Sequence, residues 1–161
     1  GRAFPCHRLD RDTSGLIIYA KSQDVQEKIM RQFKEGLVKK KYIAFVQGLV
    51  KRPFGVINYP LENKKAVTKF KLVQRRKGYS IIECEPTTGR TNQIRIHFKM
   101  IGHPILGERK FAFAKDFAVK FRRVALHAAQ IQFRHPVDGI ILSFSSKLPD
   151  DMNRLIGSLK Y

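Results

Sequence analysis

The spacing of apolar positions predicts a helix near the start of the chain. Val25, Ile29 and Phe33 recur every fourth residue, which places them on one face of a helix. Ser22 precedes this stripe and is a residue type that caps helix N-termini, and Gly36 follows it where helix C-termini favour glycine. The pattern therefore predicts an amphipathic helix between these two residues.

Shorter apolar runs, rich in β-branched and aromatic residues, predict strands in much of the remaining chain. Within residues 41–48, Tyr42, Ala44 and Val46 alternate with Ile43 and Phe45, so both faces of this strand carry apolar side chains. The predicted strands cover residues 15–20, 41–48, 67–74, 79–84, 124–133 and 139–144. Turns at residues 75–78 and 135–139 join two consecutive pairs, as expected of antiparallel hairpins.

Two more helices complete the expected architecture. Thr91 is a candidate N-cap for a helix that continues to about Met100 and stops at Gly102 and Pro104, and a last helix is predicted over residues 149–156. Strands outnumber helices and mostly follow one another. This order predicts an α+β fold in which helices flank a central, mostly antiparallel mixed sheet. No repeat or linker is recognisable, so we expect one domain over residues 1–161.

The charge of the chain points to a polyanionic partner. Lys and Arg number 32 against 13 Asp and Glu, which gives a net charge of +19. Residues 63–80 hold seven basic side chains and no acid, and residues 109–123 hold six against Asp116. Nucleic acid is the expected partner, and an anionic membrane surface is the alternative.

Several kinds of chemistry have no support in the sequence. It contains no phosphate-binding glycine loop and no Cys-x-x-Cys pair, and its histidines lack the spacing and neighbours of a metal site. Cys6 and Cys84 are too few for a disulfide framework, which favours a reducing compartment. No apolar run approaches the roughly 20 residues of a membrane span. We therefore expect no cofactor, no metal, no membrane association and a cytoplasmic location.

Acidic residues are scarce, and two of them lie close together near the start. Asp10 and Asp12 are flanked by His7, Arg8 and Arg11, directly before the first predicted strand. A carboxylate in such a polar turn is well placed for catalysis, but an aspartate that only forms the turn would give the same pattern. The spacing alone leaves both readings open.

Four stretches of the chain carry more specific information: HRLDRDTSGLIIYAK at 7–21, KKYIAFVQG at 40–48, GRTNQIRIH at 89–97 with GHPILGE at 102–108, and LHAAQIQFRHP at 126–136. In this order they resemble the motifs of the RluA-type family of RNA pseudouridine synthases, whose catalytic motif is HRLD-x-x-TSG. The resemblance covers about residues 7–156. It implies the pseudouridine synthase core fold and an isomerase that converts uridine to pseudouridine in ribosomal or transfer RNA without a cofactor.

The resemblance also implies roles for individual residues. Asp10 matches the family's essential aspartate, which acts on the target uridine as nucleophile or base. Arg8 matches an arginine that enters the RNA stack where the base is flipped out, and Tyr42 matches a tyrosine that stacks on the flipped uracil and assists proton removal. Arg95 matches an arginine that pairs with the catalytic carboxylate and keeps it ionised, and Ile94 matches an apolar residue of the base pocket.

Other residues near these motifs have open roles. Arg90 and His7 are expected to contribute to substrate binding, Arg90 by bracing its turn or contacting phosphate and His7 by holding the active-site loop. Asp12 is the rival acid, although the resemblance favours the aspartate that follows Leu9. Asn92 and Glu108 stand where family members usually have His and Asp, and we expect altered contacts without loss of the reaction.

Two other functional classes remain open. A non-catalytic RNA-binding or RNA-chaperone module could keep this fold, and a basic structural or ribosome-associated protein would explain the charge. The presence of Asp10, Tyr42 and Arg95 favours the enzyme. We expect a monomer without an obligate protein partner. Family members usually carry a further strand and a lysine–proline segment before the HRLD motif, so we also expect that the N-terminal part of the catalytic domain is missing here.

Overall fold

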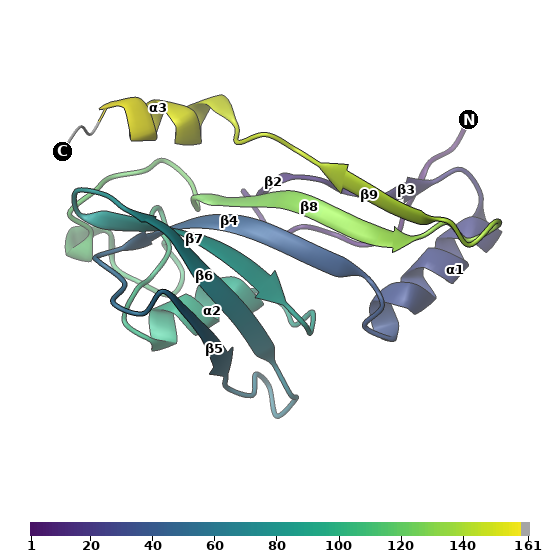
Figure 1. The fold of residues 1–161 in the computed structure, drawn as a ribbon, viewed down its shortest axis with the longest axis horizontal. Helices are drawn as coiled ribbons and strands as arrows, with labels where there is room; N and C mark the ends of the chain where they lie inside the picture. The colour runs from purple at the N-terminus through teal and green to yellow at the C-terminus, as the bar shows by residue number, and fades with distance from the viewer. Residues whose placement is uncertain (159–161) are drawn as a thin grey trace.

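A computed structural model describes residues 1–158, which form a curved seven-stranded sheet, a separate two-stranded sheet and three α-helices (Figure 1). The strands are β1 (Phe4–Pro5), β2 (Ser14–Gly15), β3 (Tyr19–Ala20), β4 (Lys39–Gln47), β5 (Phe54–Asn58), β6 (Val67–Arg75), β7 (Tyr79–Pro86), β8 (Leu126–Arg134) and β9 (Ile141–Ser145). The helices are α1 (Gln23–Lys34), α2 (Gln93–Met100) and α3 (Asp150–Ser158), with a 3₁₀ turn, η1 (Ala114–Asp116).

The large sheet is mixed and mostly antiparallel, as the sequence predicts. Its strands follow the order β2-β8-β4-β7-β6-β5, and β9 also pairs with β8. All neighbouring pairs are antiparallel except β2 and β8, which are parallel. The two predicted hairpins are β6–β7 and β8–β9. The expected α+β fold is therefore confirmed.

The first helix forms where the apolar stripe predicts it. The hydroxyl of Ser22 accepts the backbone N–H of Val25 at 3.3 Å and caps α1. Ile29 is buried, and Phe33 packs with it in a small core between α1 and the C-terminal half of β8. Gly36 has a φ of +71°, a conformation that glycine adopts without strain and that ends the helix.

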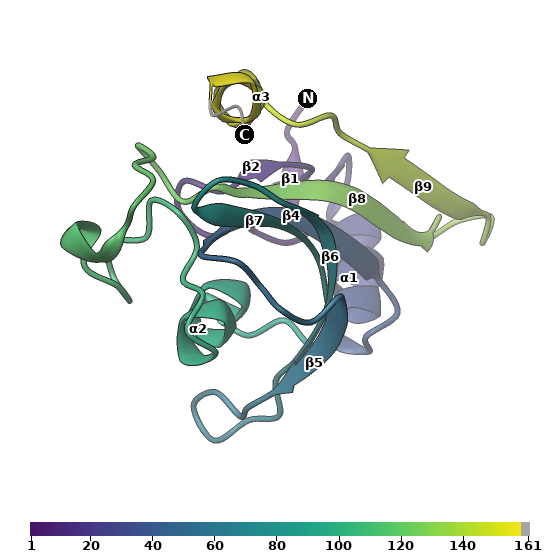
Figure 2. The ribbon, with the colours of Figure 1, turned by 60° about the vertical axis from the view of Figure 1, so that its left-hand side comes forward.

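The main core lies between the middle of the sheet and α2. Figure 2 shows the sheet curling around this helix. Ile94 and Phe98 of α2 pack against the central strands, where Ala44 and Ile82 are fully buried. Helix α3 lies on the opposite face of the sheet and contributes Met152 to the same core cluster (Figure 1).

Three details differ from the sequence-based expectation. Residues 15–20 do not form one strand, because Ser14 and Gly15 pair with β8 whereas Tyr19 and Ala20 pair with β1. Strand β5 was not expected, since the edge position leaves its apolar residues largely exposed and its pattern weak. Helix α2 is preceded by Asn92 in a left-handed conformation, without the expected Thr91 cap.

Candidate active site

Asp10 lies in a tight loop between β1 and β2, and this loop packs against β8. The loop closes on a hydrogen bond from the N–H of Thr13 to the carbonyl of Asp10 at 3.0 Å. Directly after it, Gly15 has a φ of +117°, and a Cβ added there would lie 2.3 Å from the carbonyl oxygen of Ala128. Only glycine fits so close an approach. The backbone contact with β8 therefore fixes the position of the aspartate.

Arg123 ties this loop to the C-terminal helix. Its guanidinium donates to the carbonyl of Asp12 at 2.9 Å and to the hydroxyl of Ser14 at 3.1 Å. The same group makes two hydrogen bonds to the carboxylate of Asp151 in α3, at 2.7 and 3.1 Å. Ser14 also contacts Nδ1 of buried His127 at 2.9 Å, so the loop is held from two sides.

His7 holds the other end of the loop. Its Nε2 accepts the backbone N–H of Ile18 at 2.9 Å, and its ring stacks on Phe33 with the centroids 4.6 Å apart. Burial, with a smaller contribution from the charge of Lys40, lowers the pKa of His7 to about 4. The neutral imidazole at physiological pH fits its role as an acceptor, and the hydrogen bond fits the expectation that His7 positions the loop.

A cleft of about 580 Å³ opens in front of Asp10. It brings together six of the seven predicted site residues, which come from segments far apart in the sequence: His7, Arg8, Asp10, Tyr42, Arg90 and Ile94. Desolvation, aided by the negative charge of Asp10, raises the pKa of Tyr42 to about 12. The phenol therefore keeps its proton at neutral pH and presents a ring face and a hydrogen-bond donor.

Arg95 does not line this cleft, and its partner differs from the expected one. Its Nε and Nη2 donate to the two carboxylate oxygens of Glu108 at 2.8 and 2.7 Å, in a pair with side chains 9% and 0% exposed. The expected direct pairing with Asp10 is therefore wrong. The hydrogen bond to Glu108 is the largest cause that raises the pKa of Arg95, and the charge of Asp10 adds to it through space.

Glu108 is buried because it has enough donors to replace its water. Besides Arg95, its Oε1 accepts the backbone N–H groups of Arg109 and Lys110, both at 3.0 Å. Burial opposes ionisation, but these hydrogen bonds and the guanidinium charge outweigh it and hold the pKa of Glu108 below its ordinary value.

Asn92 contacts both Asp10 and the guanidinium that pairs with Glu108. Its backbone N–H donates to Oδ1 of Asp10 at 3.4 Å, and its side-chain oxygen accepts Nη1 of Arg95 at 3.0 Å. Asn92 and Glu108 are the two positions at which the motifs depart from the usual family residues. Both departures therefore contact the same guanidinium.

The turn before α2 is braced from within. The side chain of buried Gln93 accepts from Thr88 at 2.6 Å and from the backbone of Arg90 at 3.1 Å, and donates to Thr68 at 3.0 Å. Arg90 in turn donates its Nε–H to the carbonyl of Lys65 at 2.8 Å. This contact agrees with the expectation that Arg90 braces its turn, and Arg90 also lines the cleft.

Two cleft residues were not singled out from the sequence. Lys40 lies 6.0 Å above the ring of Phe33, and burial lowers its pKa. It precedes Tyr42 by two positions in β4, and strand alternation could have placed both on the cleft side. Thr13 also lines the cleft, and its buried hydroxyl has no hydrogen-bond partner among residues 1–158.

Within the described part of the chain, no three His, Cys, Asp or Glu side chains converge as a metal site would require. No described helix is both long and apolar enough to cross a membrane. Cys6 and Cys84 are buried and form no disulfide.

Comparison with known proteins identifies the family. Residues 1–100 match the family model described as RNA pseudouridylate synthase. This chain belongs to that family. It is 37% identical to the dual-specificity RNA pseudouridine synthase RluA of Haemophilus influenzae, over 91% of this chain and 74% of that protein.

Other relatives are longer. The chain is 37% identical to the uncharacterized RNA pseudouridine synthase YlyB of Bacillus subtilis, over 96% of this chain and 55% of that protein. It is 34% identical to the ribosomal large subunit pseudouridine synthase D of Nitrosomonas europaea, over 99% of this chain and 52% of that protein. The chain thus spans about half the length of these two relatives.

Solved structures confirm the pseudouridine synthase fold. Human RNA pseudouridylate synthase domain containing 4 superimposes with a TM-score of 0.85 at 22% sequence identity, covering 98% of this chain and 76% of that one. Human RNA pseudouridylate synthase domain containing 1 gives a TM-score of 0.80 at the same identity, covering 98% and 80%.

Proposed function

We propose that this family member isomerises uridine to pseudouridine in structured RNA, with Asp10 as the central reacting group. The observation that carries the proposal is the cleft in which Asp10, Tyr42 and Ile94 meet from three separate motifs. Its volume of about 580 Å³ is within the usual range of small-molecule sites. A flipped uridine fits this mixture of one carboxylate, one aromatic ring and apolar walls.

The reaction needs few functional groups. The bond between sugar C1′ and uracil N1 breaks, the uracil turns, and a bond forms between C1′ and C5. The proton on C5 is released and N1 gains one, so atoms and electrons balance without a redox partner. A carboxylate at Asp10 suffices to add to the sugar or base, or to take a sugar proton.

Extraction of the base from the RNA stack is the second requirement. Unstacking costs a few kcal/mol, and enzymes that act on bases recover it through contacts in the pocket. Arg8, exposed at the cleft edge, would occupy the vacated space, and Tyr42 would stack on the extruded uracil. The raised pKa of Tyr42 supports a role as ring platform and donor more than as proton acceptor.

Ribosomal RNA is the substrate class that we propose, with transfer RNA as the alternative. The name of the Nitrosomonas relative refers to the large ribosomal subunit, and that of the Haemophilus relative to dual specificity. The net charge of +19 suits a large folded RNA, and we propose that the protein acts on it in the cytoplasm. We further propose that it acts as a monomer.

Tritium release tests the proposal. Ribosomal and transfer RNA labelled with tritium at uracil C5 lose the label only when C5 is joined to the sugar. Wild type should release tritium, whereas Asp10→Asn, which keeps the shape of the side chain, should not. Asp12→Asn is the matched control and should retain most of the release. If wild type binds RNA but releases nothing, the catalytic proposal fails and a binding module is favoured.

A further inference from the structure

A second groove lies on the other side of Asp10. It has a volume of about 680 Å³ and shares Arg8, Asp10 and Thr91 with the first cleft. Its cations come from the Asp10 loop, from α2 and from the segment 109–122: Arg8, Arg11, Arg95, Arg109, Lys110 and Arg122. Asp10 thus stands on the boundary between a base-sized cleft and a strongly basic groove.

Most of this positive charge is not neutralised by the protein. Arg95 is paired with Glu108, but within residues 1–158 none of the other five cations forms an ion pair. The groove contains two carboxylates, Asp10 and Asp12, against these five. Arg109, Lys110 and Arg122 are exposed. Such a concentration of uncompensated cations repels itself and favours a polyanionic ligand.

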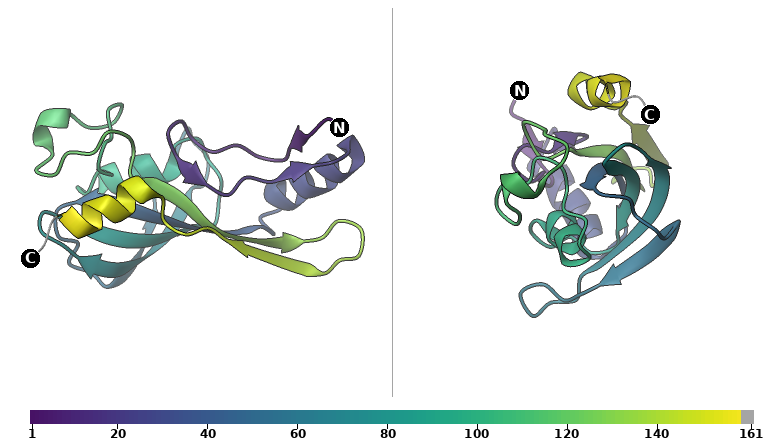
Figure 3. Two further views of the ribbon diagram at one scale, coloured as in Figure 1. Left: turned by 90° about the horizontal axis from the view of Figure 1, so that it is seen from above. Right: turned by 90° about the vertical axis from the view of Figure 1, so that its left-hand side faces the viewer.

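The basic segment, residues 109–122, has its two ends in contact with each other and is attached to the catalytic region. Gly107 has a φ of +81°, and a Cβ there would lie 1.7 Å from the carbonyl of Arg123, so the two ends of the segment are in close contact. Arg109 also donates to the carbonyl of Arg122 at 3.2 Å. Between these ends, the segment projects at the end of the molecule opposite α1 (Figure 3). The backbone of Arg109 and Lys110 is held by Glu108, as described above.

We infer that this groove binds the backbone phosphates of the RNA strand next to the flipped uridine, through Arg109, Lys110 and Arg122. The inference rests on the proposed function, because the shared boundary at Asp10 places the groove where the strand leaves the base cleft. Guanidinium groups suit phosphate oxygens because their planar donors bind two oxygens at once. Such contacts position RNA without reading its sequence.

Salt dependence of RNA binding measures these contacts. Each phosphate contact on a single strand contributes about 0.7 to the slope of log affinity against log salt. Replacement of the three residues by glutamine should therefore lower the slope for fluorescein-labelled oligouridylate by about 2. Between about 50 and 200 mM salt, wild type should then lose roughly 16-fold more affinity than the variant.

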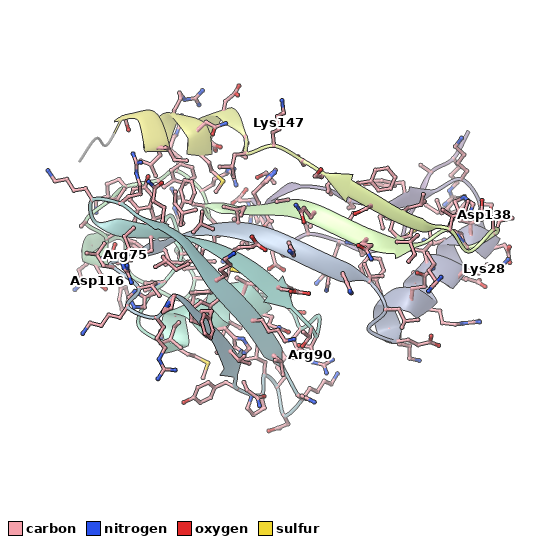
Figure 4. All side chains as sticks on the ribbon, viewed as in Figure 1. Lys28, Arg75, Arg90, Asp116, Asp138 and Lys147 are labelled. Atoms are coloured by element: carbon pink, nitrogen blue, oxygen red, sulfur yellow. The ribbon has the colours of Figure 1, made fainter. Side chains whose placement is uncertain are left out.

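Two control variants separate a groove from general surface charge. Replacement of Lys28, Arg52 and Lys147 by glutamine removes the same charge from exposed positions outside both clefts; Lys28 and Lys147 lie well apart from Arg90 in Figure 4. This triple variant should change the slope far less. A variant with Arg109→Lys, Lys110→Arg and Arg122→Lys keeps the charge and should keep the slope.

The outcomes distinguish this inference from the proposed function. With labelled ribosomal RNA, the glutamine variant of the groove should lose tritium-release efficiency through KM, with little change in kcat. An unchanged salt slope in the folded groove variant, or equal flattening in the surface control, overturns the inference even if wild type is active. If wild type releases no tritium but the slope falls as expected, the groove binds phosphates and the proposed function fails.

Discussion

The pair between Arg95 and Glu108 allows a quantitative test by Glu108→Gln. The carboxylate is fully buried and accepts four donors: two from Arg95 and the backbone N–H groups of Arg109 and Lys110. Glutamine has nearly the same shape but keeps only one acceptor, and its amide nitrogen would face a donor of Arg95. Removal of one partner from a buried ion pair costs about 3–5 kcal/mol, because the other charge stays buried without compensation.

Urea unfolding measured by circular dichroism gives the loss in free energy of unfolding directly. In thermal unfolding, a loss of this size corresponds, for a domain of this length, to a decrease in Tm of roughly 6–20 °C. Arg95→Met should be similarly destabilising, and the double variant should be much more stable than the sum of the single effects predicts. The explanation is refuted if Glu108→Gln unfolds within about 1 kcal/mol of wild type, or if the two changes are additive.

The same pair has a pH signature. The pKa of Glu108 in the folded protein is below its ordinary value of 4.5, so the folded state binds fewer protons than the unfolded state in the acidic range. Its contribution to stability is therefore complete above pH 4.5 and decreases as the pH falls through the folded-state pKa. The stability difference between wild type and Glu108→Gln should shrink over this acidic range.

Three further predictions follow from the site. The pKa of His7 is about 4 in the folded protein and near 6.5 when unfolded, so the free energy of unfolding of wild type should fall by about 1 kcal/mol between pH 7 and 5, after allowance for solvent exposure. In urea titrations at these two pH values, His7→Gln should show a weaker pH dependence, and an equal dependence in the two proteins would contradict the prediction. Gly15→Ala should destabilise by about 3 kcal/mol and abolish tritium release because of the clash with Ala128, whereas Gly36→Ala, with a positive φ but open space, should cost only about 1 kcal/mol by thermal unfolding. Tyr42→Phe should keep most of the tritium-release activity, whereas Tyr42→Leu, which removes a stacking face worth about 1–3 kcal/mol, should lower kcat/KM by roughly 5- to 150-fold; equal losses would indicate that the hydroxyl matters more.

The sequence predicts elements well where the local pattern and the tertiary environment agree. Helix α1 has its cap, its apolar stripe and its terminal glycine within one segment, so residues 22–36 contain all the information that it needs. Strands β4, β6 and β7 are similarly clear because β-branched or aromatic residues are prominent among their buried positions, such as Phe45, Phe70 and Ile82. Strand β5 was missed because a sheet edge buries little of it.

The residues of the candidate site could be located, but not all of their contacts. Six predicted residues line one cleft, because the family resemblance supplied positions that periodicity alone could not. The predicted partner of Arg95 was wrong because a salt bridge forms with whichever carboxylate is buried beside the guanidinium in the folded chain. That carboxylate is Glu108, which lies 13 positions away in a different turn. The basic groove beside Asp10 requires loops that come together only in three dimensions.

The parallel contact between β2 and β8 has a consequence for synthesis of the protein. Ser14 and its partner His127 are 113 positions apart in the sequence. The Asp10 loop therefore lacks the strand against which it packs until β8 has left the ribosome. A nascent chain that ends just after Arg95 already carries every predicted catalytic residue but lacks the strand that positions the first of them. At about 5–20 residues per second, β8 follows roughly 2–7 s later. Assembly of the site is therefore a late, long-range event of folding, and nascent chains arrested before β8 should leave the N-terminal loop open to proteolysis.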